Sequence, residues 1–153
     1  MFEESVESFI TQWRPYAADA ALFAHTEGSP LLECAAAGAI FGVFERTGPY
    51  TAHSGPAKLI LHLMAEQVEL LEEPERRLEV VGPSRLKVTG LVVLRQGQML
   101  VVDAGVPLVV GSFGAPSDTL AAGDWVSVNG LAPVHGFVVP KTRSTLAAVH
   151  AEI

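Results

Sequence analysis

Histidine and carboxylate side chains are the groups in this chain that could ligate a metal ion or transfer a proton. The spacing of the five histidines is not that of a metal-ligand set: His25, His53, His62, His135 and His150. One local pair stands out, because His62 and Glu66 would share a face if their segment were helical, although Lys58 on that face would oppose a cation. We expect a solvated helix face in that case, and neither a metal nor another cofactor.

Nucleophilic and acid–base chemistry is also poorly represented. Cys34 lies beside three alanines, which is typical of an inert packed thiol. Asp103, Asp118 and Asp124 stand at turn or cap positions, where aspartate is a structural choice. No serine sits in a Gly-x-Ser-x-Gly elbow, and no glycine-rich loop is followed by the lysine of a phosphate site. We therefore assign no catalytic residue.

A tryptophan beside basic residues is the best candidate for binding. If Val126 and Val128 face a core, the alternation of a strand places Trp125 on the opposite face. There it could stack on a base or sugar, anchor a subunit interface, or be covered by the N-terminal helix. We expect packing rather than stacking. The binding candidates, which Phe137 could join, are Trp125, Phe113, Arg85, Lys87 and Arg95.

Composition favours protein partners over nucleic acid. Charged residues make up 18% of the 153 residues, below the usual ~25%, and the mean hydropathy is +0.33. A net charge of −7 opposes binding of a polyanion. Only the half after residue 80 is close to neutral. A homo-oligomer or a protein partner is therefore expected to bury the apolar excess.

The sequence also suggests where the chain works. No apolar run reaches the ~18 residues of a membrane span, so no membrane contact is expected. The first residues are acidic, unlike a signal peptide, and a single cysteine suits a reducing compartment. We expect a cytoplasmic protein of one domain, residues 1–153.

The first part of the domain, residues 1–30, is expected to be helical. Acidic residues lie in its first turn. Its apolar residues recur at helical spacing: Phe2, Val6, Phe9, Ile10 and Trp13. Pro15 should kink this helix or start a second one reaching about His25.

Additional strands are expected over residues 31–84. Residues 31–46 are interpreted as one long strand bent at Gly38 and Gly42. Residues 57–73 fit a helix by periodicity, yet the preceding strand needs a neighbour, and we favour a bent strand. Its apolar parity changes after Gln67, so such a strand requires a bulge.

Residues 85–140 are expected to form the core of a small OB-like β-barrel. The order is three strands, a short helix over 117–123, and two strands joined by a turn at Asn129-Gly130. The central hairpin turns at Asp103-Ala104-Gly105 and is apolar on both faces, so the helix or another subunit should cover its outer face. A short helix is expected within 141–153, at Ser144–Glu152. The fold class is mainly β.

Three functions are compatible with these patterns. The leading expectation is a non-enzymatic barrel module that acts by binding or self-assembly. The alternative is binding of single-stranded nucleic acid or an oligosaccharide, and an enzyme whose site is not visible in the sequence comes third.

Overall fold

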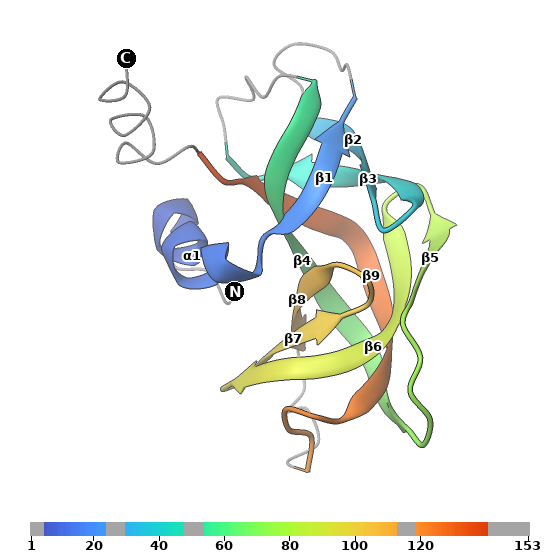
Figure 1. Cartoon of the computed structure of the whole chain (residues 1–153). Helices are drawn as coiled ribbons and strands as arrows, with labels where there is room; N and C mark the ends of the chain where they lie inside the picture. The colour runs from blue at the N-terminus through green and yellow to red at the C-terminus, as the bar shows by residue number, and fades with distance from the viewer. Residues whose placement is uncertain (1–4, 24–29, 48–53, 113–118, 141–153) are drawn as a thin grey trace, which may run out of the picture.

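The computed structural model describes residues 5–23, 30–47, 54–112 and 119–140 (Figure 1). It is mainly β, with one N-terminal helix, α1 (Val6–Trp13), followed by a 3-10 turn at Arg14–Tyr16. Phe2, residues 117–118 and the expected C-terminal helix lie outside the described residues. The nine strands are β1 (Ala18–Leu22), β2 (Leu31–Ala36), β3 (Ala39–Glu45), β4 (Gly55–Leu71), β5 (Arg77–Gly82), β6 (Arg85–Gln96), β7 (Met99–Asp103), β8 (Pro107–Ser112) and β9 (Trp125–Val138).

All nine strands belong to one mixed sheet that closes in a ring. Their order is β1-β2-β3-β9-β4-β8-β7-β6-β5, and additional pairings join β1 to β4 and β9 to β6. Neighbouring strands pair in two closed circuits, and the long strands β4 and β9 belong to both circuits. One circuit adds β1, β2 and β3, and the other adds β8, β7 and β6.

The ambiguous segment 57–73 is a strand, as favoured. β4 pairs with β9 over most of its length, and the register shifts between Ala65 and Gln67, where the apolar parity changes. The expected bulge is therefore confirmed. Helical periodicity misleads here because β4 carries one extra residue between Ala65 and Gln67, which breaks the two-residue alternation that Leu59, Leu61, Leu63 and Ala65 follow.

Two expectations for the N-terminal half are wrong. Residues 18–22 form β1, not a second helix, because Pro15 begins only a single 3-10 turn. Residues 31–46 form the hairpin β2–β3 and not one bent strand, with both Ala37 and Gly38 at positive φ in the turn. β5 at 77–82 is an additional strand that the sequence interpretation does not single out.

The last strands also differ from the expectation. β9 runs without a break through Asn129 and Gly130, so no turn divides it. Gly130 is needed for close approach instead, because a Cβ there would overlap Leu63 and lie 2.9 Å from the carbonyl oxygen of Leu86. Residues 119–123 form turns where a helix was expected.

Two apolar clusters hold the sheet together. The larger one fills the inside of the ring and includes Val126 and Val128, as expected from their parity. The smaller cluster lies beneath α1, which covers the outer face of the central strands as expected for the β7–β8 hairpin. Its buried members are Phe9, Trp13, Ile60, Met99, Val101, Val109 and Phe137.

Candidate functional site

The pair His62 and Glu66 is separated by the fold. His62 is 3% exposed beneath α1, where its Nδ1–H donates to the carbonyl oxygen of Val109 at 3.0 Å. Glu66 is exposed on the strand beyond and binds Arg85, with 3.1 Å between Oε2 and NH2. Over the described ranges, no three His, Cys, Asp or Glu side chains gather closely enough to hold a metal ion.

A second histidine lies next to His62 but is committed to an arginine. The ring centroids of His62 and His135 are 6.1 Å apart, and Arg46 NH1 lies 3.0 Å from His135 Nδ1. Because a guanidinium can only donate, Nδ1 of His135 is the acceptor and its proton lies on Nε2. Glu45, which precedes Arg46 in the sequence, is also buried. Thr47 donates to its Oε1, and its Oε2 has no partner among the described atoms.

Cys34 does not supply a nucleophile. It is fully buried in the inner cluster, and burial, helped by the charge of Glu33, raises the pKa of its thiol to about 12. A thiol with so high a pKa stays protonated at neutral pH and is a poor nucleophile. This confirms the expected packed cysteine.

Trp125 is half-buried on the outer face of the ring. Trp125 on β9 lies between Leu71 on β4 and Leu91 on β6, and Leu91 in turn pairs with Asp103 on β7, so the four residues form one row across the sheet. The guanidinium of Arg76 covers its ring at 4.9 Å and also binds Asp103, with 3.2 Å between Nε and Oδ2. Asp103 makes the expected turn contact as well, since its Oδ1 accepts from the amide of Gly105. The indole therefore packs within its own subunit.

The other binding candidates do not gather around Trp125. Arg85 and Lys87 share its outer face, but Arg85 binds Glu66 and the carbonyl oxygen of Gly130. Arg95 lies beyond a register shift in β6 and pairs with Leu100, an inner residue. Its side chain therefore extends from the inner face, opposite to the face that carries Trp125. There it donates to the carbonyl oxygen of Leu120. Regular alternation along β6 would put Leu94 on the inner face with Val92, but the same shift places it against the outer cluster.

Neither candidate phenylalanine extends the set. Phe113 lies outside the described residues. Phe137 is fully buried and stacks on Phe9 with 4.4 Å between ring centroids, so it cannot join an exposed surface.

Replacing Trp125 by alanine is expected to lower the melting temperature, because the indole packs against Arg76 and the row beside it. The cost should be ~1–2 kcal/mol, below the 3–5 kcal/mol of a fully buried tryptophan. Thermal unfolding followed by circular dichroism measures this effect. Replacing the exposed neighbour Ala122 by serine is the control, and a Trp125 variant with an unchanged melting temperature would contradict the packing.

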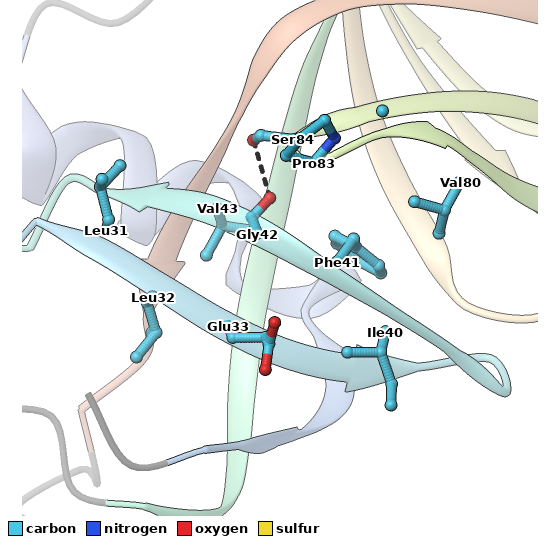
Figure 2. A pocket seen from close by; sticks show the side chains of 11 residues that line it. Leu31, Leu32, Glu33, Ile40, Phe41, Gly42, Val43, Val80, Pro83 and Ser84 are labelled. Carbon is cyan, nitrogen blue, oxygen red and sulfur yellow. Dashed lines mark hydrogen bonds between the residues drawn. The ribbon is translucent and has the colours of Figure 1, made fainter.

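An apolar hollow between β3 and β5 is the surface best suited to binding (Figure 2). It has a volume of about 870 Å³. Three large aliphatic side chains on its rim are exposed: Leu31 by 64%, Ile40 by 57% and Val80 by 42%. Val81, also exposed, follows Val80 in β5. Glu33 is the one charged residue in the lining, which comprises Leu31, Leu32, Glu33, Ile40, Phe41, Gly42, Val43, Val80, Gly82, Pro83 and Ser84.

The β5–β6 turn closes one end of this hollow. The amide of Gly42 donates to the carbonyl oxygen of Pro83 at 2.7 Å, and Ser84 Oγ donates to the carbonyl oxygen of Gly42 at 2.7 Å (Figure 2). A Cβ on Gly42 would lie only 2.9 Å from the Pro83 oxygen. Glycine at this position thus allows the turn to rest on β3, and the hollow has a fixed end.

Reasoning from the sequence missed this surface. Its rim residues come from β2, β3 and β5, and the last of these strands was not recognised. The available signal was the pair Val80-Val81 in a charged stretch, which gives a strand an apolar residue on both faces.

Comparison with known proteins gives no further guidance: no family model, no curated protein and no solved structure matches this chain. Among the described residues, no helix is long and apolar enough to cross a membrane.

Proposed function

We propose that this chain is a non-enzymatic module that assembles with a second copy of itself through the hollow between β3 and β5. The observation that carries the proposal is the gathering of exposed aliphatic side chains at one place. Leu31, Ile40 and Val80 line the same hollow, and Val81 adjoins it. Single exposed apolar residues are ordinary, whereas a contiguous group of them marks an interaction surface.

The low charge of the chain supports a second copy as the occupant. Only 18% of the residues are charged, and an apolar surface on such a chain is matched in character by the same surface on another copy. Isologous contacts between identical patches are also the commonest way in which soluble proteins assemble. The single lining charge, Glu33, is exposed on β2 and does not belong to β5, so it can stay at the solvated rim.

An OB-like barrel as the framework is part of the same proposal. The circuit of β6, β7, β8, β4 and β9 has the five strands that such a barrel needs. Its fifth strand is β4, which precedes the other four in the sequence, while β9 alone replaces the two strands expected over 125–139. The cytoplasmic location expected from the sequence belongs to the proposal as well.

The alternative, binding of single-stranded nucleic acid or an oligosaccharide, draws little support from the geometry. Basic side chains on the outer face are paired with acids: Arg85 with Glu66, Arg76 with Asp103, and Arg77 with Glu75 and Glu79. Such pairs leave little positive charge for phosphates.

Sedimentation of variants at micromolar concentration tests the proposal. The wild-type chain should sediment as a dimer, and the double variant Leu31→Lys, Ile40→Lys should sediment as a monomer, because lysine heads would have to be desolvated in the interface. Leu70→Lys is the matched control, since Leu70 is 63% exposed on β4 and lies outside the hollow. A wild-type monomer, or equal dissociation constants for the three proteins, would refute self-assembly through this surface.

A further inference from the structure

β5 forms a free edge of the sheet. Within the part of the chain that the structure describes, β5 pairs with β6 along one side and with no strand along the other. Figure 1 shows β5 at the margin of the molecule. An unpaired strand edge presents a row of main-chain donors and acceptors to any strand that lies alongside.

The hydrogen bonds of β6 determine which residues of β5 direct their main-chain N–H and C=O groups to the free edge. Both the N–H and the C=O of Val92 bond towards β9, to the oxygen of Asp124 and the amide of Gly123. Because these directions alternate along a strand, Lys87 and Thr89 turn theirs towards β5, where they pair with Glu79 and Arg77. It follows that Leu78 and Val80 direct their main-chain groups to the free edge.

We propose that two copies join by antiparallel pairing of their β5 strands, with Leu78 of one copy opposite Leu78 of the other. This inference rests on the proposed self-assembly and specifies its geometry. Val80 lines the hollow, so a strand added along the β5 edge lies against the apolar surface described above. The paired strands continue the sheet of one subunit into that of its partner.

Charge selects this register among those that the hydrogen bonds allow. A twofold pairing that places Leu78 opposite itself sets Arg77 opposite Glu79 of the partner subunit, and this favourable contact occurs twice. A shift that centres Arg77 or Glu79 instead puts like charges opposite each other, which destabilises a strand pair. A pairing centred on Val80 places no charged residue of the partner opposite Arg77 or Glu79. It also brings Pro83 into the pairing, where it has no N–H to donate.

A charge-swap cycle on the full-length chain tests the register by sedimentation. Arg77→Glu and Glu79→Arg should each raise the dimer dissociation constant about tenfold or more, because two attractive pairs become repulsive. The double variant should return to within about threefold of wild type, since the opposite charges are then restored in exchanged positions. Lys58→Glu is the control for Arg77→Glu: it makes the same change of net charge in another exposed ion pair, with Asp19, and should leave the dissociation constant unchanged.

Amide hydrogen exchange provides the second measurement. Raising the protein concentration through the dimer transition should slow exchange at the amides of Leu78 and Val80, which point to the free edge. A wild-type monomer would refute the proposed function and this inference together. A dimer that is sensitive to Leu31→Lys, Ile40→Lys but insensitive to both charge reversals, with no added protection at Leu78 and Val80, would overturn the strand pairing alone.

Discussion

Replacing Phe9 by alanine is expected to lower the free energy of unfolding by about 3–5 kcal/mol. Phe9 is 2% exposed, stacks on Phe137 and contacts the ring of His62 at a centroid distance of 5.0 Å. It joins the only described α-helix to the outer face of the sheet, so its removal would leave a cavity that rigid strands cannot close. The loss includes both the burial of the ring and that cavity.

Denaturant unfolding monitored by circular dichroism measures this change. Gln12→Ala is the control, because Gln12 is exposed on the same helix and should shift stability by no more than ~0.5 kcal/mol. If both variants unfolded at the same denaturant concentration, α1 would be an appendage and not a cover for β4, β7, β8 and β9.

The helix was predictable because its apolar residues repeat at short range. Val6, Phe9, Ile10 and Trp13 define one face by spacing alone, and the structure places that face on the sheet. The first strand expected within 85–140, which is β6, and the turn at Asp103-Ala104-Gly105 were likewise predictable from short stretches of sequence. In each case the pattern within about ten residues determines the local structure.

The hairpin at residues 31–45 could not be found in this way. Its turn places Ala37 at φ 51° beside Gly38 at φ 76°, and alanine is a poor indicator of a left-handed turn. Residues 31–36 and 39–45 therefore resemble one continuous apolar strand. Only the pairing of the two strands with each other shows that the chain reverses.

The binding surface depends on contacts that are remote in sequence. Gly42 meets Pro83 and Ser84 because β3 and the β5–β6 turn converge, a relation that no local pattern encodes. For Trp125 the alternation of the strand correctly predicted the face of the side chain. It could not predict Arg76, which covers the indole ring and lies 49 positions earlier. Local alternation gives the direction of a side chain and leaves its neighbours undetermined.

Gly90→Ala is expected to destabilise the chain by about 3 kcal/mol, the upper end of the usual cost of overpacking. Gly90 lies in β6 where the end of β7 crosses it closely. A Cβ at this position would overlap the carbonyl oxygen of Asp103 and lie 2.7 Å from its carbonyl carbon and 3.1 Å from the Cα of Ala104. These are main-chain atoms, so no side chain can rotate away and the β7–β8 turn itself would have to move.

Denaturant unfolding compares this variant with Gly82→Ala. A Cβ on Gly82 would meet only the Cβ of Arg85, at an ordinary contact distance of 3.4 Å, so its free energy of unfolding should stay within ~0.5 kcal/mol of wild type. Both glycines lie in strands of the same hairpin, so the two variants share any intrinsic cost of replacing glycine by alanine. If they were equally stable, Gly90 would not lie against the main chain of Asp103, and the packing of the β7–β8 turn on β6 would be wrong.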